Sequence, residues 1–267
     1  MKKRKKLALA AALLGLLTAL YCSKTIDRQD WTVCSQRLPQ AFDGLRITLL
    51  TDLHGRQLDV LAEQVAVSAP DIIAICGDLV DENTDGEVIW PLLKQLCAVA
   101  PTYFVTGNHE WVREDTELLL EKIAGCGVTV LRNDYLCLER EGQTLVLAGA
   151  EDPNGYADQE RPEAFLTRVR REVGGDPYVV MLYHRNDALT LWSELEADVV
   201  LSGHGHGGVI RLPIVGGVLG VDRSLFPDNC EGLLTRGRTT MAVSRGLGGM
   251  RLWNPPHLPT IVLRTEP

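Results

Sequence analysis

Short, almost continuously apolar runs alternate with longer amphipathic stretches along most of this chain, and this alternation limits the fold more than any other feature. Runs of this kind are typical of strands covered on both faces, and the stretches between them have helical spacing. The pattern predicts an α/β domain whose strands are flanked by helices. The predicted strands are residues 47–50, 72–76, 102–105, 146–148, 178–183, 199–201 and 261–264, and the predicted helices are residues 60–68, 88–96, 114–124 and 163–173.

The N-terminus has a different character. The basic sequence KKRKK at residues 2–6 precedes an uncharged apolar run over residues 7–22. As a helix, sixteen residues rise about 24 Å, slightly less than a hydrocarbon core of about 30 Å, so a signal-peptide core and a short signal anchor both fit. We favour the anchor because no small-residue cleavage site follows and because Tyr21 poorly matches the residue before a lipidated cysteine. Cleavage and lipidation stay open as alternatives.

Basic residues before an apolar run hold the N-terminus in the cytoplasm. We therefore expect a single-pass protein of the cell membrane whose folded part lies outside the cytoplasm. Residues 1–22 would be the basic region and transmembrane signal anchor, residues 23–30 a linker, and residues 31–267 one domain. Within that domain, the proline-rich residues 251–259 predict an irregular connection before the last strand.

The charge and the cysteines exclude some classes of partner and site. The chain has 27 basic and 35 acidic residues, so without the five N-terminal cations 22 basic residues face 35 acidic ones, a charge of −13. Such a body repels nucleic acid polymers, although a small anion could bind at a local cationic centre. The seven cysteines include no CxxC pair typical of a zinc site, and their disulfide state is left open.

Five of the apolar runs end in residues that can bind a metal ion, most of them with a glycine alongside. The carboxyl ends of strands in an α/β sheet are where ligands bind, so we expect these side chains to converge. Glycines there permit tight turns that point neighbouring side chains inward. The residues in these positions are Asp52, His54, Asp78, Asn108, His109, His184, His204 and His206.

Each of these residues also has an ordinary structural interpretation. An aspartate such as Asp52 can cap a helix, and Asp78 and Asp81 can form turns. A lone histidine such as His184 is more often a hydrogen-bonded core residue than a ligand. A joint metal site is nevertheless favoured, because the ordinary roles would require many independent coincidences at strand ends.

The blocks TDLH, GDLVD, GNHE, a lone histidine and GHGH occur in that order between residues 46 and 210. This series resembles the calcineurin-like metallophosphoesterases. The later GGVIRLP, LFP, SRGLGG and NPP look like the small bacterial membrane-associated branch of YkuE/YaeI type. The resemblance implies a sandwich of two mixed β-sheets flanked by helices, with the active site at the strand ends.

The resemblance also implies two divalent metal ions. Asp78 would bridge them and His109 would act as general acid. Asp81 would not bind an ion itself but would contact the ligands with its carboxylate. Glu110 departs from the aspartate found in many members of the family. One ion would be bound by Asp52, His54 and His206, and the other by Asn108, His184 and His204.

Carboxylate, imidazole and amide ligands together suit Mn, Fe or Zn better than Ca, and we expect Mn first. A metal-bridging hydroxide would attack the phosphorus, while His109 protonates the leaving oxygen. The expected function is hydrolysis of phosphate esters, by a phosphodiesterase or a phosphatase, near the membrane. Alternatives are a lipid pyrophosphate hydrolase that uses the same site and a non-catalytic metal-binding scaffold.

Several further residues have a provisional interpretation. Arg56, Arg185 and Arg211 adjoin the motif blocks and are candidates for phosphate contacts, with solvated surface arginines as an equal alternative. His257 lies outside every block and is expected to be structural. An anchor would favour lipid or envelope-linked substrates, but the sequence does not disclose the substrate or a preference for monoesters or diesters.

Overall fold

The computed structural model describes residues 15, 18, 25–212 and 214–266. The anchor predicted over residues 1–22 lies outside these residues, except for Gly15 and Thr18. Within the described part of the chain, no helix combines the length and the apolar character needed to span a bilayer.

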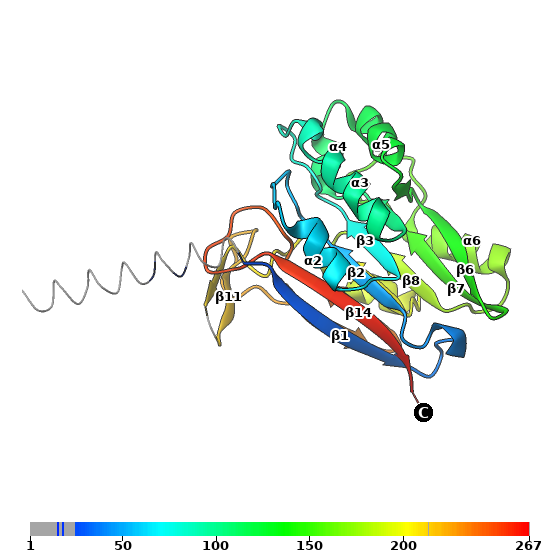
Figure 1. The fold of residues 1–267 in the computed structure, drawn as a ribbon. Coiled ribbons are helices and arrows are strands. Elements are labelled where there is room, and N and C mark those ends of the chain that lie inside the picture. The colour runs from blue at the N-terminus through cyan, green and yellow to red at the C-terminus, as the bar shows by residue number, and fades with distance from the viewer. Residues whose placement is uncertain (1–14, 16–17, 19–24, 213, 267) are drawn as a thin grey trace, which may run out of the picture.

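Two six-stranded sheets form the centre of the molecule (Figure 1). The strands of the first sheet are β1 (Asp27–Ser35), β2 (Arg46–Leu50), β3 (Ile72–Cys76), β4 (Thr102–Val105), β5 (Thr129–Val130) and β14 (His257–Thr265). The strands of the second are β6 (Asp134–Arg140), β7 (Gln143–Gly149), β8 (Val179–Leu182), β9 (Val199–Ser202), β12 (Gly232–Arg236) and β13 (Thr239–Val243). A separate hairpin consists of β10 (Ile210–Leu212) and β11 (Gly216–Leu219).

Both large sheets are mixed. Their strand orders are β1-β14-β2-β3-β4-β5 and β12-β13-β9-β8-β7-β6. In the first sheet, β14 is antiparallel to β2 and the other pairs are parallel. In the second, antiparallel pairs at both edges flank the parallel strands β13, β9, β8 and β7. The parallel strands of each sheet therefore end at a common edge.

Helices cover the outer face of each sheet. Buried side chains of α2 (Leu61–Val67), α3 (Trp90–Val99) and α5 (Thr116–Gly125) pack on the first sheet, and those of α6 (Pro162–Val173) and α7 (Leu189–Glu194) pack on the second. Shorter elements are α4 (Asn108–Val112) and the 3₁₀ turns η1 (Gln40–Phe42), η2 (Gly86–Val88) and η3 (Asn186–Ala188).

The central strands are apolar throughout because both of their faces are covered. Along β3, Ile72, Ala74 and Cys76 pack into the layer between the two sheets, whereas Ile73 and Ile75 pack against the helices. Successive residues of a strand point to opposite faces, so each face needs its own apolar set. The predicted α/β fold with two mixed sheets and flanking helices is confirmed, and each predicted strand and helix is present with its ends within four residues.

Two predicted boundaries are wrong. The linker over residues 23–30 extends too far, because Asp27–Asp30 already belong to β1, an exposed edge strand whose polar side chains hide its pairing with β14. The connection over residues 251–259 is irregular only as far as Pro256, since β14 begins at His257. Pro259 is tolerated there because it pairs with β1 alone, β2 pairing only from Thr260 onward.

Candidate metal centre

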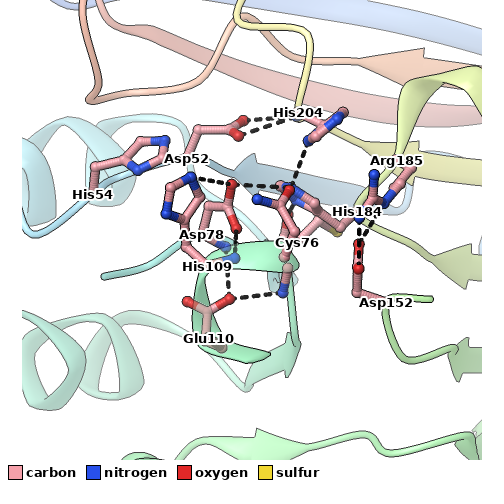
Figure 2. A network of polar contacts seen from close by, with 12 residues as sticks. Asp52, His54, Cys76, Asp78, His109, Glu110, Asp152, His184, Arg185 and His204 are labelled. Atoms are coloured by element: carbon pink, nitrogen blue, oxygen red, sulfur yellow. Dashed lines mark hydrogen bonds and ion pairs between the residues drawn. The ribbon is translucent and has the colours of Figure 1, made fainter. Parts of the chain in front are cut away.

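The predicted ligands gather where parallel strands of the two sheets end (Figure 2). The first sheet provides three oxygen ligands and one imidazole, from the turns after β2 and β3 and from the start of α4 after β4. The second sheet provides imidazoles only, from the turns after β8 and β9. In chain order the residues are Asp52, His54, Asp78, Asn108, His184, His204 and His206.

One cluster combines Asp52, His54 and His206. Nε2 of His54 lies 3.2 Å from Nε2 of His206, and Oδ1 of Asp52 lies 3.4 Å from that same His206 atom. One potential ligand atom from each residue lies within 4.8 Å of the others. This is the set that the family resemblance assigned to one ion.

A second cluster surrounds Nε2 of His184. Oδ2 of Asp78 lies 3.1 Å from this nitrogen, Oδ1 of Asn108 lies 3.2 Å from it, and Nδ1 of His204 also lies 3.2 Å from it. These are the residues that the resemblance assigned to the other ion. The structure thus brings together all seven predicted ligands, in the two predicted sets.

The hydrogen bonds behind the histidines show that these clusters fit metal ions. Nδ1 of His184 lies 2.8 Å from the carbonyl oxygen of Cys76, which can only accept, so Nδ1 carries the proton in the neutral ring and Nε2 turns a lone pair to the site. Nδ1 of His54 is held by the Asp81 carboxylate in the same way, and Nε2 of His54 faces His206. Lone pairs that converge at such distances repel unless a cation lies among them.

A proton on His184 can partly take the place of a cation. Burial lowers the pKa of His184, but the charge and hydrogen bond of Asp78 outweigh burial and raise this pKa to about 10. Burial also acts to raise the pKa of Asp78, yet His184 and the backbone N–H of His109 bring it below its ordinary value. The two groups form an ionic pair, and a divalent ion that binds there would have to displace the proton from His184.

The backbone at the ligands is unusual. Asp52, His54, Asp78, His204 and His206 all have positive φ values, between 50° and 65°. Such conformations cost non-glycine residues roughly 1–3 kcal/mol each and cluster at functional sites. Folding of the rest of the domain offsets this backbone strain. The predicted ligands are therefore already in position before an ion binds.

The carboxylate of Glu110 joins the loops that carry Asp78 and Asn108. Glu110 is fully buried and accepts backbone N–H groups of Gly107, Asp78 and Leu79 at 2.7, 3.0 and 2.7 Å. Burial and the nearby charge of Asp78 raise the pKa of Glu110 to about 7. The sequence showed Glu110 only as a departure from the family pattern, and this positioning role was missed.

The glycines of SRGLGG are a second feature that sequence reasoning missed. A Cβ atom added to Gly246 would approach Cβ of Asp52 to 2.7 Å, and one added to Gly249 would approach Cε1 of His206 to 2.6 Å. The loop after β13 therefore lies directly against the first cluster. Its glycine pattern was visible in the sequence, but nothing local connected it with Asp52.

His109 lies at the edge of the site, next to both clusters. Its Nε2 lies 4.0 Å from Oδ2 of Asp78, while its Nδ1 lies 3.0 Å from Oε2 of Glu82 and 3.5 Å from Oδ1 of Asp81. Burial lowers the pKa of His109, but Asp78, Glu82 and Asp81 together raise it above its ordinary value. The ring is thus oriented, and its protonated form is favoured by these carboxylates, as suits a proton donor. Sequence reasoning did not identify Glu82.

The three candidate arginines have partners inside the protein. Arg185 forms two hydrogen bonds, of 2.8 and 2.9 Å, with the buried carboxylate of Asp152. Arg211 pairs with Glu231, and Arg56 donates to the carbonyl oxygen of Leu247 at 3.3 Å. Phosphate contact by Arg56 or Arg185 stays a prediction.

His257 is a buried residue of the first sheet. Its Nδ1 accepts the backbone N–H of Arg245 at 3.2 Å, and its ring lies 5.2 Å from that of Trp31. These contacts fit the structural role expected for it.

A cavity of about 270 Å³ opens beside the second cluster. His204 and Asn186 line it, together with Val221, Asp222 and Cys230 of the loop after β11. A group bound to the clusters could extend into this space.

The model of the calcineurin-like phosphoesterase family, Metallophos, matches residues 45–208. The chain belongs to this family. A site with two metal ions is typical of the calcineurin-like phosphoesterases, and the protein is accordingly a metal-dependent phosphoesterase, a hydrolase whose substrates are phosphate esters.

Known relatives include proteins from bacteria and animals. The uncharacterized metallophosphoesterase YkuE of Bacillus subtilis is 30% identical over 85% of this chain and 80% of its own length. The phosphodiesterase YaeI of Escherichia coli is 29% identical over 64% of each chain. A zebrafish transmembrane protein with a metallophosphoesterase domain is 29% identical over 74% of this chain, which spans only 47% of that relative.

Likeness to solved structures is more remote. The phosphopantetheinyl hydrolase of Mycobacterium tuberculosis shares 14% identity and a TM-score of 0.44, over 76% of this chain and 89% of its own. A likeness at this level does not support a shared substrate.

Proposed function

We propose that this protein is a binuclear hydrolase of phosphate esters, with Asp52, His54 and His206 around one ion, Asn108, His184 and His204 around the other, and Asp78 shared. The observation that carries the proposal is the convergence of imidazole nitrogens and oxygen atoms in two clusters. Mn is the first expectation for both ions, with Fe or Zn as alternatives, because the ligand set is of intermediate hardness.

The ions would supply an activated water and neutralise charge on the phosphate. The protein's own groups do the rest. Asp81 and the Cys76 carbonyl fix the rings of His54 and His184, and Glu110 joins the loops that carry Asp78 and Asn108. His109 is placed to give a proton to the leaving oxygen, and Glu82 holds the opposite side of its ring.

We further propose a single-pass membrane protein, with residues 1–22 as the anchor and the catalytic domain outside the cytoplasm. Lipid or envelope-linked phosphate esters are the substrates that such a location favours. The names of two relatives support this direction: one is called a transmembrane protein, and the other a phosphodiesterase. A non-catalytic scaffold is disfavoured because every ligand position is filled by a competent residue.

The test is to purify the full chain in detergent, remove metal, and reload it separately with Mn, Fe or Zn. Two bound ions per chain and hydrolysis of phosphate diesters or monoesters are expected with at least one metal. A chain that binds two ions tightly and hydrolyses no phosphate ester, lipid pyrophosphates included, would be a scaffold. Asp59→Asn, on the exposed surface beyond the first cluster, is a suitable control for purification and loading.

A further inference from the structure

The β10–β11 hairpin and the loops beside it form an exposed apolar surface, here called the hairpin surface. Large side chains on it are mostly exposed to solvent: Ile214 is 108% exposed, Met250 80%, Leu225 71% and Phe226 61%. Val215 and Val221 add further exposed apolar area. Contiguous apolar patches on a protein surface mark sites of interaction with proteins or membranes.

These residues belong to one structural unit although they come from separate stretches of chain. Leu252 bridges to Ile210 on one side of the hairpin, and Leu225 bridges to Leu219 on the other. The backbone N–H of Phe226 also bonds to the carbonyl of Val218. The loops are therefore continuous with the hairpin, and their apolar side chains lie on the same part of the molecule.

The internal packing of the fold does not account for the exposure. Ile214 has a φ of 71°, a left-handed conformation that is unfavourable for a β-branched residue, and its side chain has no covering neighbour among the described residues. A turn of this shape is normally occupied by glycine or asparagine. An exposed isoleucine there costs stability and solubility, so its benefit lies in a contact made outside the described chain.

The hairpin surface lies where the chain enters the domain. The backbone N–H of Asp27, the first residue of β1, bonds to the carbonyl of Pro256, a few residues beyond Met250 and Leu252. Trp253 donates its Nε1–H to the carbonyl of Gly15 at 3.0 Å. Gly15 belongs to the apolar run of residues 7–22, so one described residue of that run contacts the loop that carries Met250 and Leu252.

We propose that the hairpin surface inserts into the interfacial layer of a lipid bilayer. A second copy of the chain is a weaker interpretation, since Trp253, next to Leu252 in this surface, bonds to Gly15, a residue of the apolar run expected to enter a membrane. The inference goes beyond the proposed hydrolysis and does not depend on it. It has a consequence for the site, because Val221 belongs both to this surface and to the wall of the cavity beside His204. Docking would place that cavity at the membrane surface.

The attraction is apolar rather than ionic. Arg223 is accompanied on the same loop by the exposed Asp222 and Asp228, and Arg211 is paired with Glu231. The chain as a whole has a charge of −8. Neutral phosphatidylcholine should therefore bind this surface at least as well as anionic lipid, and added salt should not release it, in contrast to a polybasic membrane site.

The experiment reconstitutes the full chain into phosphatidylcholine vesicles that contain a phosphatidylcholine with a photoactivatable acyl chain. After illumination, labelled peptides are identified by mass spectrometry. We expect label in the peptides that carry Ile214, Leu225, Phe226 and Met250, unchanged by salt. Ile214→Ser combined with Phe226→Ser should lower labelling of the hairpin peptides at least fivefold. Val67→Ser combined with Val112→Ser, whose side chains are 61% and 62% exposed on other elements, should leave it unchanged.

Three results would overturn the proposal. One is the absence of hairpin label in vesicles that carry the protein. Another is undiminished labelling of the hairpin peptides in the Ile214→Ser, Phe226→Ser variant, provided that this variant and the control variant both have the wild-type melting temperature. The third is crosslinking of hairpin peptides to a second chain, or to residues 7–22, in place of lipid. Asp78→Asn should abolish hydrolysis but not labelling, so failure of the docking and failure of the enzyme assignment are distinguishable.

Discussion

The two sheets make unequal contributions to the metal centre. Of the predicted ligands, the first sheet supplies Asp52, Asp78 and Asn108, which offer oxygen atoms, and one histidine, whereas the second supplies histidines only. Each proposed ion takes ligands from both sheets. An ion bound in either cluster would therefore be a crosslink across the sandwich, and the charge of the ion would be neutralised almost entirely from the first sheet.

The largest effect is expected from Asp78→Asn, which removes the first-sheet carboxylate that both ions are proposed to share. This variant tests whether the first sheet supplies most of the neutralising charge. Loss of an outer partner of a metal ligand costs about 10- to 100-fold, so loss of a ligand common to two ions should cost on the order of 10⁴-fold in rate. Metal content should fall at both sites. The measurements are bound metal per chain and kcat/KM, with Asp59→Asn as the exposed control. Retention of two tightly bound ions at full rate would remove the bridging assignment.

If the ions crosslink the sheets, chelation should destabilise the whole domain. A ligand at a thousand times its Kd stabilises the folded state by about 4 kcal/mol, which for a domain of this size corresponds to roughly 10 °C in the melting temperature. Thermal melts of the full chain with and without chelator measure this difference. His184→Ala, on the second sheet, should lose most of the metal-dependent gain. A melting temperature indifferent to metal would show that the sheets are held by their apolar contacts alone.

The proposed proton donor, His109, follows a strand of the first sheet, and its role can be separated from metal binding. His109→Ala should slow esters with poor leaving groups about 100-fold while affecting activated nitrophenyl esters little, since only the former need a proton on the leaving oxygen. Metal content should stay at the wild-type value. Glu82→Gln is the matched positioning variant, with a smaller loss of the same selectivity. Equal losses on both esters would exclude the general-acid assignment.

The smallest expected effect concerns pH and the pair that joins the sheets, His184 and Asp78. The pKa of His184 is raised from 6.5 to about 10, so binding of an ion there must release a proton, and affinity should fall about tenfold for each pH unit between about pH 8 and pH 6. In metal-free protein the stability of the fold depends on pH in the opposite direction. The pair contributes its full stability below the unfolded-state pKa of 6.5 and loses it as pH rises through about 10. Metal titrations and melts at several pH values test both slopes.

The sequence was sufficient for those parts of the molecule that are determined locally. β3 could be predicted because all five of its residues are apolar, as a strand buried on both faces requires. Asp78 could be predicted as a ligand because it follows that strand closely. β1 could not be predicted, because its side chains are polar and its partner β14 lies at the other end of the chain. The same limit applied to Glu82, whose bond with His109 depends on how two loops meet.

Arg185 shows a related limit. Its position after His184 suggested a contact with phosphate, while the structure shows its guanidinium bound by Asp152, 33 positions away in the chain. Spacing along a sequence indicates which groups reach a strand end. Whether such a group is already paired with another side chain depends on loops from distant segments of the chain. A single motif does not contain that information.

The long parallel pairing of β1 with β14 has a mechanical consequence. Nine consecutive residues of β1 are in register with β14, from Asp27 with His257 to Ser35 with Thr265. A force that pulls on the chain ahead of Asp27 acts along these strands, so it shears many inter-strand bonds at once instead of opening them one after another. A domain tethered through its N-terminus would resist drag at this joint.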